Sequence, residues 1–308
     1  MQAPSEGEAN DGRSRARTIA VTNQKGGVGK TTTAINLSAC LASSGYRVLL
    51  VDMDPQGNAT SGVGVEKSQI GNCVYEVLVE GVDPHGVIMP GPVDGMEVLP
   101  STLDLAAAEI ELAAELSREN RLRTGLTGIK REYDFVIIDC PPALGLLTIN
   151  SLSAADETLI PIQSEYYALE GLVYLLRTIQ RVKTHVNPRL AIAGILVTMF
   201  DSRTNLSKDV EAEVRREYPG LTMKTVIPRS VRLSEAPGFG KPITLHAPSS
   251  KGAKAYMELA KEVVRSGEKG AGQGTGRTYW LGGERGEPPG TNSGGGHQAE
   301  PQATKEKL

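Results

Sequence analysis

Residues 18–32 read TIAVTNQKGGVGKTT, and this stretch decides the fold. A short β-rich run is followed by a glycine-rich turn and then by a helical run that begins at Lys30. This order is typical of a phosphate-binding P-loop, whose spacing G-x-x-x-x-G-K-[ST] is met loosely by K-G-G-V-G-K-T at residues 25–31. Glycines let such a loop wrap closely around phosphate oxygens, while its N–H groups and the helix N-terminus point at the anion.

The positions of the loop have distinct predicted roles. Lys30 is expected to reach the β- and γ-phosphates of a nucleotide, and the Thr31 hydroxyl to bind Mg²⁺. The backbone of the rest of the loop is expected to cradle the phosphates. The predicted phosphate-binding set is Lys25, Gly26, Gly27, Val28, Gly29, Lys30, Thr31 and Thr32.

Acidic residues end two other predicted strands. RVLLVD is followed by MDPQGN, which puts Asp52 and Asp54 at a strand end, and DFVIID ends in Asp139 in the manner of a Walker B strand. Carboxylates at the carboxyl edge of a parallel sheet suit a metal-and-water site. We therefore predict that Asp139 holds Mg²⁺ through water, with Asp54 and Thr31 in the same metal site. We expect neither Asp52 nor Asp54 to be only a helix cap or turn former.

Strand and helix signals alternate through residues 18–265. Predicted strands are TIAVTN, RVLLVD, MEVLPS, DFVIID, TLIPIQ, AIAGILVTM and KTVI. Predicted helices cover 30–43, 103–116, 119–131, 145–153, 167–185, 205–217 and 250–265. The alternation predicts an α/β fold of the P-loop NTPase type, a doubly wound, mostly parallel sheet with helices on both faces. Scarce aromatic residues leave Val, Ile, Leu and Ala to fill the core, as such buried sheets favour.

The chain ends and the cysteines exclude several classes of protein. Residues 1–17 and 266–308 are polar or rich in Gly, Pro and Ser, and we predict disordered tails there. The sequence has no run of 18 apolar residues, so it predicts no membrane span. The N-terminus lacks the apolar stretch of a secretory signal. Cys40, Cys73 and Cys140 form no CxxC pair, which favours reduced core thiols in a cytosolic protein.

Charge is distributed unevenly. Between Asp52 and Glu119 there are thirteen acidic and two basic residues, whereas between Lys183 and Lys254 there are twelve basic and six acidic ones. Such asymmetry indicates either an electrostatic partner on the basic side or helix faces that are simply solvated, and charge alone favours the second.

Lys25, at the head of the loop, is the informative departure from the standard motif. With this lysine and with D-x-D-P-Q-G-N at residues 52–58, the sequence resembles the deviant Walker A family, and within it the ParA/Soj chromosome-partitioning ATPases, over about residues 18–265. The resemblance implies an ATP-dependent homodimer in which Lys25 reaches the nucleotide of the other subunit and Gly27 lies at the crowded two-fold axis. It assigns Asp54 to the attacking water and Asp52 to the surroundings of the metal.

Two further segments match the Soj-like subgroup, TMFDSRTNL at 198–206 and VIPRSVRLSEAP at 226–237. The resemblance implies that Pro228 packs on adenine, and that Arg203 and Arg232 belong to a DNA-binding edge of the dimer. The basic excess then becomes a patch for the backbone of double-stranded DNA, bound without sequence preference.

The resemblance also implies a biological role. Lys25, Lys30 and Asp54 would form the catalytic set of an ATP hydrolase whose cofactors are ATP and Mg²⁺. A ParB-type centromere-binding protein would stimulate hydrolysis, and the chain would act in the cytoplasm, on the nucleoid, to segregate a chromosome or a plasmid. The sequence leaves open which of these is the cargo, whether replication initiation is regulated, and what the tails do.

Three rival functions need different features. A MinD-like membrane-cycling ATPase needs an amphipathic helix at its extreme C-terminus; the helix predicted at 250–265 has one apolar face, but a polar tail follows and we expect that face to pack on the sheet. An iron–sulfur ATPase of the nitrogenase iron-protein type needs cysteines at a dimer interface, where only Cys140 is suitably near a strand end. A non-catalytic scaffold is disfavoured by Lys25 and Asp54 together.

Overall fold

The computed structural model describes residues 16–165 and 168–271. Most of the two predicted tails, 1–17 and 266–308, therefore lies outside the described residues. Where the tails are described, they continue the folded part: Arg17 begins the first strand and residues 266–271 end the last helix. That helix was predicted to end at residue 265.

Seven strands form one sheet in the order β3-β4-β2-β5-β1-β6-β7. All neighbouring strands pair in parallel except β3, an antiparallel edge strand that the sequence did not predict. The strands are β1 Arg17–Val21, β2 Val48–Asp52, β3 Met89–Pro90, β4 Met96–Leu99, β5 Phe135–Asp139, β6 Glu157–Gln163 and β7 Ala191–Thr198. The order places β1 between β5 and β6. The P-loop, which follows β1, therefore lies among the carboxyl ends of the inner strands.

The helices connect these strands and confirm the predicted alternation. Those predicted at 30–43 and 205–217 have these same bounds. Short helices that the sequence did not predict lie in the connections after β2 and after β7. The helices are α1 Lys30–Ser43, α2 Asn58–Gly62, α3 Val74–Val79, α4 Leu105–Glu111, α5 Arg121–Leu126, α6 Leu146–Ala154, α7 Ala168–His185, α8 Asn205–Glu217, α9 Val231–Glu235, α10 Ile243–His246 and α11 Lys251–Ala271.

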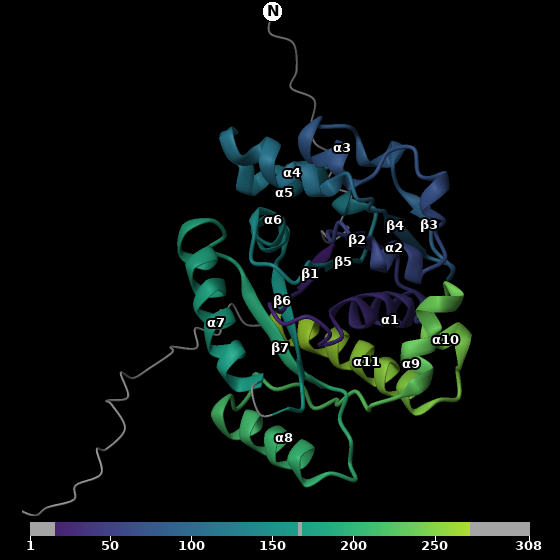
Figure 1. Ribbon diagram of the computed structural model, residues 1–308, viewed down its shortest axis with the longest axis vertical. Coiled ribbons are helices and arrows are strands. Elements are labelled where there is room, and N and C mark those ends of the chain that lie inside the picture. The colour runs from purple at the N-terminus through teal and green to yellow at the C-terminus, as the bar shows by residue number, and fades with distance from the viewer. Residues whose placement is uncertain (1–15, 166–167, 272–308) are drawn as a thin grey trace, which may run out of the picture. The chain divides into compact units, whose positions relative to one another are not determined.

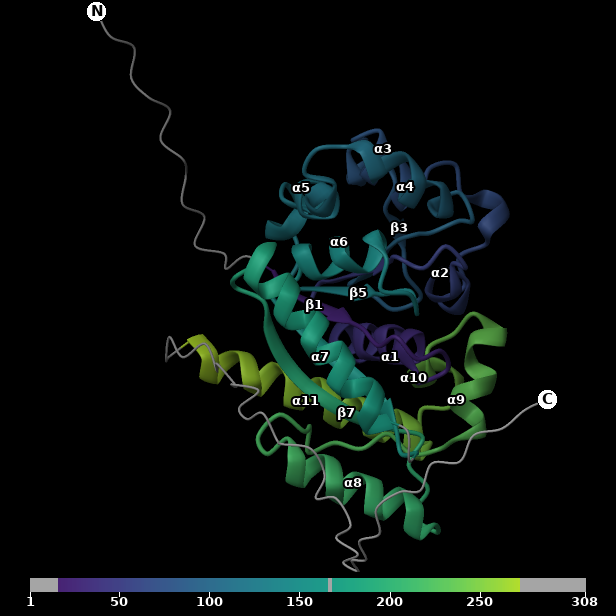
Figure 2. The same cartoon turned by 60° about the vertical axis from the view of Figure 1, so that its left-hand side comes forward.

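Helices cover both faces of the sheet, as Figures 1 and 2 show. Alternate strand residues belong to two separate apolar clusters: Ala20, for example, packs in one and Ile19 in the other. The first cluster includes residues of α3 to α7, and the second includes residues of α1 and α11. This two-sided burial is what a parallel sheet requires, and it confirms the predicted fold class.

One predicted strand does not form. Residues 224–227, KTVI, are no strand, although their neighbourhood pairs with β7 through two isolated bridges, Ile195 with Thr222 and Phe200 with Pro228. The Ile227 N–H still donates to the Val197 carbonyl at 2.9 Å. The segment thus follows the end of β7 without forming the continuous ladder that its β-rich composition suggested.

The apolar face of α11 is covered by the rest of the fold. Tyr256, Leu259 and Val263 are each at most 1 % exposed, and the Tyr256 hydroxyl lies 3.2 Å from that of Thr33 in α1. The expectation that this helix packs on the body is therefore confirmed. No described helix combines the length and the apolar character that crossing a bilayer requires.

Side chains from two different segments, Asn187 and Lys130, cap the C-terminal carbonyls of α6. Asn187 Nδ2 donates to the carbonyls of Leu152, Ser153 and Ala155 at 2.9, 3.2 and 2.7 Å. Lys130, only 1 % exposed, donates to Ala154 O at 2.7 Å. Cations and donors at this end satisfy carbonyls that a helix leaves without internal partners. They hold in place the helix that follows the Asp139 loop.

Asn187→Ala should lower the free energy of unfolding by about 1–3 kcal/mol, because buried carbonyls at the end of α6 lose their donor. Urea denaturation followed by circular dichroism measures it. Thr184→Ala is the control, since the exposed Thr184 hydroxyl bonds only within α7; it should change stability by less than about 0.5 kcal/mol. Equal stability of the Asn187 variant and the wild type would contradict this account of the cap.

Candidate functional site

The P-loop joins β1 to α1 and is shaped by two glycines with positive φ. Gly27 has φ +75° and Gly29 has φ +87°, a region that residues with a side chain adopt at a cost. A Cβ added at Gly26 or Gly27 would meet no described heavy atom within 4 Å, so the space beside them is open. Open space lined by loop backbone at a helix N-terminus is what a bound phosphate needs.

Lys30 is nearly buried at the first position of α1, with 7 % exposure. Its Nζ donates to the Lys25 carbonyl at 3.2 Å, so the ammonium group lies at the head of the loop. Burial lowers the pKa of Lys30, while the charges of Asp139 and Asp54 act to raise it. The lysine therefore sits between the loop and the acidic residues at the ends of β2 and β5.

Asp139 ends β5 and is fully buried, and neither of its carboxylate oxygens has a hydrogen-bond partner among the described residues. Burial and the nearby charge of Asp52 raise its pKa well above the usual range. The Thr31 hydroxyl is close enough to lower that pKa, although its contact does not meet hydrogen-bond geometry. A buried carboxylate left in this state is costly unless a cation joins it.

Asp52 is the register partner of Asp139 across β2 and β5 and is also fully buried. It differs from Asp139 in that its carboxylate oxygens accept hydrogen bonds. It accepts hydrogen bonds from the Asp54 N–H at 3.1 Å and from the N–H and hydroxyl of Thr60 at 2.8 and 2.7 Å. Asp52 thus organises the turn into α2 through Thr60, eight residues on, whose two donors the local motif did not reveal. The expectation that Asp52 is more than a turn former stays a prediction.

Asp54 lies just past the end of β2 and is 8 % exposed. Its Oδ1 accepts from the Gln56 N–H at 3.0 Å, and its carbonyl accepts from the Ser101 hydroxyl at 2.8 Å. These contacts fix its backbone and one carboxylate oxygen. With Lys30 and Asp139 it lies at the carboxyl edge of the sheet, where α/β folds bind ligands.

These residues fit a nucleotide with Mg²⁺. Asp54 and Asp139 lie near the buried ammonium group of Lys30, and Asp52 lies near Asp139. Carboxylates and hydroxyls are the ligands that Mg²⁺ takes in phosphate sites. Thr31 and the unpartnered Asp139 are thus suited to the metal, and the loop amides and Lys30 to the phosphates.

Comparison with known proteins places the chain in a family. A family model described as "AAA domain" matches residues 16–192. Over 249 residues the chain is 57 % identical to the sporulation initiation inhibitor protein Soj of Bacillus subtilis, a match that covers 81 % of this chain and 98 % of that protein. It is 52 % identical over 249 residues to the chromosome partitioning protein ParA of Myxococcus xanthus, covering 81 % and 88 %. The chain belongs to the ParA/Soj family of ATPases.

Solved structures agree with membership of the ParA/Soj family in fold. One described as cobyrinic acid a,c-diamide synthase from Mycobacterium smegmatis, with bound ATP analogue and magnesium, is 40 % identical with a TM-score of 0.74, covering 83 % of this chain and 97 % of that one. The cell division ATPase MinD of Pyrococcus furiosus is 27 % identical with a TM-score of 0.67, covering 82 % and 99 %. The likeness to these two structures is one of fold, whereas membership of the ParA/Soj family rests on the sequence identities to Soj and ParA.

Lys25, at the head of the loop, points outward. Its Nζ forms a 2.9 Å ion pair with Glu165, which follows β6, and both side chains are about half exposed. An exposed pair of this kind contributes at most about 1 kcal/mol. Lys25 can therefore exchange Glu165 for a phosphate charge at little cost.

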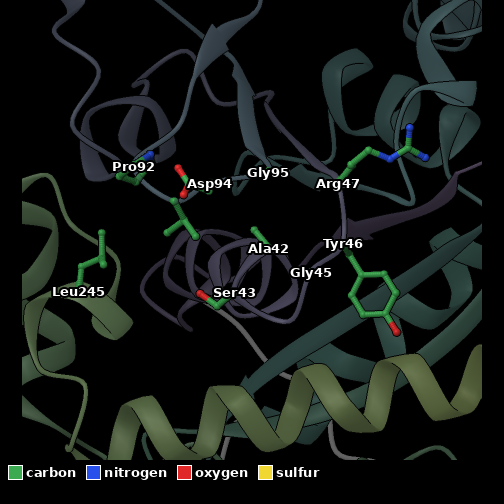
Figure 3. Close-up of a pocket in the computed structure, with 10 residues that line it drawn as sticks. Ala42, Ser43, Gly45, Tyr46, Arg47, Pro92, Asp94, Gly95 and Leu245 are labelled. Carbon is green, nitrogen blue, oxygen red and sulfur yellow. The ribbon is translucent and has the colours of Figure 1, made fainter.

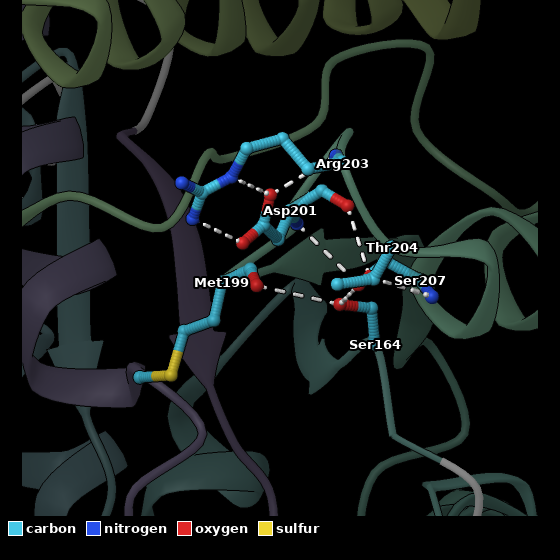
Figure 4. A network of polar contacts seen from close by, with 6 residues as sticks. All are labelled: Ser164, Met199, Asp201, Arg203, Thr204 and Ser207. Carbon is cyan, nitrogen blue, oxygen red and sulfur yellow. Dashed lines mark hydrogen bonds and ion pairs between the residues drawn. The ribbon is translucent and has the colours of Figure 1, made fainter.

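Arg203 and Arg232 are both exposed, and each is paired with a carboxylate of its own segment. Figure 4 shows Arg203 in the loop after β7, bound to Asp201 through Nε at 2.9 Å and Nη2 at 2.7 Å. Arg203 holds the pKa of Asp201 well below its usual range. Arg232, in α9, pairs with Glu235 at 3.0 Å. The two carboxylates belong to different segments of the described part of the chain, so the predicted common edge of the two arginines stays a prediction.

Pro228 lies near the P-loop side of the sheet. It pairs with Phe200, two residues beyond Thr198, and Thr198 donates to the Val28 carbonyl at 2.8 Å. Its predicted contact with adenine is compatible with this place and stays a prediction. Sequence reasoning missed Thr198 and also Gln163, which donates to the Gly27 carbonyl at 2.9 Å. Thr198 and Gln163 are the last residues of two strands of the same sheet, and this position at a strand end was the available sequence signal.

The described residues also line a surface hollow of about 640 Å³. Figure 3 shows the side chains that line it. Its lining includes Tyr46 and Arg47, which directly precede β2, and Asp94 and Leu245. The hollow is therefore at the amino end of β2, whereas Asp52 and Asp54 are at its carboxyl end. It is separate from the candidate site.

Asp139→Asn should raise the stability of the nucleotide-free protein, because the amide replaces a carboxyl group whose charged form is destabilised by burial and by Asp52. We expect a gain of about 1 kcal/mol or more, roughly 2–4 °C in Tm per kcal/mol for a chain of this size. The same variant should lose most of the Tm increase that Mg²⁺ with ADP gives the wild type. Differential scanning calorimetry with and without the ligand measures both effects.

Asp52→Asn is the matched control, since it makes the same change on the neighbouring strand. It should destabilise by about 1–3 kcal/mol, because an amide nitrogen would then face N–H and O–H donors. If Asp139→Asn destabilises as Asp52→Asn does, the two buried acids do not differ as described.

Proposed function

We propose that this chain is an ATP hydrolase that dimerises on ATP, binds DNA without sequence preference and segregates a chromosome or plasmid. The observation that carries the proposal is the placement of an unpartnered buried Asp139, Lys30 and an open glycine loop at one sheet edge. The phosphates of a nucleoside triphosphate and its Mg²⁺ would complement the charges of these groups.

Each site residue has a defined task in hydrolysis. Lys30 holds the β- and γ-phosphates, with the amides of residues 26–32 around them. Thr31 and Asp139 hold Mg²⁺, which when bound offsets negative charge on the phosphates. Asp54 orients the attacking water from its fixed position past β2; its contact with the Gln56 N–H keeps the carboxylate in place. These tasks require positioning and electrostatics rather than a covalent intermediate.

Dimerisation depends on Lys25. In one subunit its ammonium group is exposed and, among the residues that the structure describes, pairs only with Glu165. A second subunit's ATP offers more negative charge than one carboxylate, so Lys25 exchanges partners when two ATP-bound subunits meet. ADP, which lacks the γ-phosphate, offers Lys25 less negative charge than ATP does. This makes the dimer dependent on ATP and returns monomers after hydrolysis.

DNA binding depends on the basic segment between residues 183 and 254. Arg203 and Arg232 are exposed there, and their own carboxylate partners are weak competitors because such surface pairs contribute little. Two subunits double the number of cations, and affinity rises steeply with the number of phosphate contacts. A ParB-type partner bound at a centromere-like site would stimulate hydrolysis, and the protein would act in the cytoplasm on the nucleoid.

The MinD-like membrane-cycling function is the second candidate. Only the fold favours it, through the likeness to MinD of Pyrococcus furiosus. The apolar residues of α11 whose side chains are described pack in the core, so they are not free to contact a lipid surface. The iron–sulfur function is disfavoured because Cys140 is fully buried, where burial raises the pKa of its thiol to about 12.

Asp54→Ala should bind ATP, remain dimeric and hydrolyse ATP roughly 100-fold or more slowly, because the water loses its orienting group.

Lys25→Ala should bind ATP as a monomer. Size-exclusion chromatography with light scattering, with ATP and with ADP, and a phosphate-release assay measure these effects. Glu165→Ala is the control that removes only the partner of Lys25 within the subunit, and it should still dimerise on ATP. Full ATP-dependent dimerisation of Lys25→Ala would contradict the role in the other subunit.

Arg203→Ala and Arg232→Ala should each weaken ATP-dependent DNA binding alike for two unrelated duplexes. Each should reduce the slope of log affinity against log salt by about one unit, since one phosphate contact is lost. Fluorescence anisotropy across a salt series measures this, with Arg131→Ala as an exposed control away from the basic segment. Unchanged binding in both variants, or strong preference for one duplex, would count against the arginine edge.

A further inference from the structure

Two carbonyl groups of the P-loop are held by side chains from outside the loop. The Thr198 hydroxyl, at the end of β7, donates to Val28 O at 2.8 Å, and Ile162 O lies at 3.0 Å as a second, longer acceptor. Gln163 Nε2, at the end of β6, donates to Gly27 O at 2.9 Å. Thr198 is 2 % exposed, so water does not readily replace its hydroxyl. Successive carbonyls of the loop are thus tied to two adjacent strands.

The direction of each carbonyl fixes the direction of an N–H. In a trans peptide unit the C=O and the following N–H point opposite ways, and the described residues contain no cis peptide bond. When Gly27 O turns toward Gln163, the Val28 N–H turns away from it. When Val28 O turns toward Thr198, the Gly29 N–H likewise turns away from Thr198.

These two N–H groups lie in the part of the loop that offers donors to an anion. The positive φ of Gly27 and Gly29, on either side of Val28, gives the alternation by which neighbouring N–H groups converge on one concave site. The carbonyls point out of that site, and Thr198 and Gln163 receive them. A carbonyl turned inward would instead repel a phosphate.

We infer that Thr198 and Gln163 are positioning residues that set the Val28 and Gly29 amides toward the phosphates before the nucleotide arrives. The inference rests on the proposed nucleotide binding at this loop. Amides already aimed at the ligand need not reorganise on binding, which is where preorganised donors gain affinity. Thr198 acts more strongly than Gln163, because Gln163 is only half-buried and shares its amide with Met199 Sδ at 3.0 Å.

The same end of β6 also carries Glu165, two residues beyond Gln163, which pairs with Lys25. The loop backbone and its outward lysine are therefore held by one strand end. This proximity leads us to expect that a change at Gln163 affects Lys25 as well, whereas a change at Thr198 affects only the loop amides. Thr198 is for that reason the cleaner site for a test.

Thr198→Val keeps the shape of the side chain and removes the donor. Affinity for ADP with Mg²⁺, measured by isothermal titration calorimetry, should fall roughly 3- to 10-fold, the range expected for one hydrogen bond. Thr198→Ser restores the hydroxyl and should bind within about twofold of the wild type. In ¹⁵N-correlated spectra, the downfield shift of the Gly29 amide proton on adding ADP should shrink in Thr198→Val and return in Thr198→Ser.

Thr158→Val is the matched control. Thr158 is a fully buried threonine of β6 whose hydroxyl donates to Ala20 O at 3.1 Å, a carbonyl of β1 and not of the loop. This variant should lose thermal stability much as Thr198→Val does, yet keep wild-type ADP affinity and the wild-type Gly29 shift. A general structural effect would lower affinity in both.

Wild-type affinity in Thr198→Val, failure of Thr198→Ser to restore it, or an equal loss in Thr158→Val would each overturn the inference alone. Failure of the wild type to bind ADP with Mg²⁺ would overturn the proposed function, and this inference with it.

Discussion

The site depends on a carboxylate buried at the end of β5 that has no hydrogen-bond partner in the part of the chain that the structure describes. Asp139 lies in the centre of the sheet, beside Asp52, with only Lys30 as a buried ammonium group nearby. Taking such a charge out of water costs free energy that the apo fold does not recover locally. The arrangement becomes favourable when a cation and a phosphate group complete it. The fold is thus prepared for a ligand that brings both.

The rest of the architecture holds this charge in place. β5 is central in the sheet, and both of its faces are covered by helices. The loop after Asp139 leads into α6, whose far end is fixed by Asn187 and Lys130. On the other side, β6 and β7 end in Gln163 and Thr198, which hold the P-loop. Charge, loop and helix are therefore positioned by separate strands that share one edge.

The sequence was sufficient for the parts that depend on local pattern. The strand–loop–helix at 18–43 follows from apolar runs and glycine spacing, and the ends of β2 and β5 follow from acids after apolar residues. It was not sufficient where individual side-chain contacts or the path of the chain decide the outcome. Asp52 accepts hydrogen bonds from Thr60, eight residues on, and Arg203 pairs with Asp201, two residues before it. Residues 224–227 form no strand, because their neighbourhood pairs with the β7 segment only through isolated bridges. Thr198 and Gln163 carried no motif, since their effect depends on strand order, which brings residues 163 and 198 to the loop at 27–28.

The central claim is that nucleotide and Mg²⁺ together complete the buried acidic site. Isothermal titration calorimetry of the wild-type chain with the nucleotide, in excess Mg²⁺ and in excess EDTA, tests it most directly. The account predicts tight binding with Mg²⁺ and binding weaker by at least about tenfold without it, because phosphates and Asp139 then meet with no divalent cation between them. Equal affinity in both buffers would contradict the account.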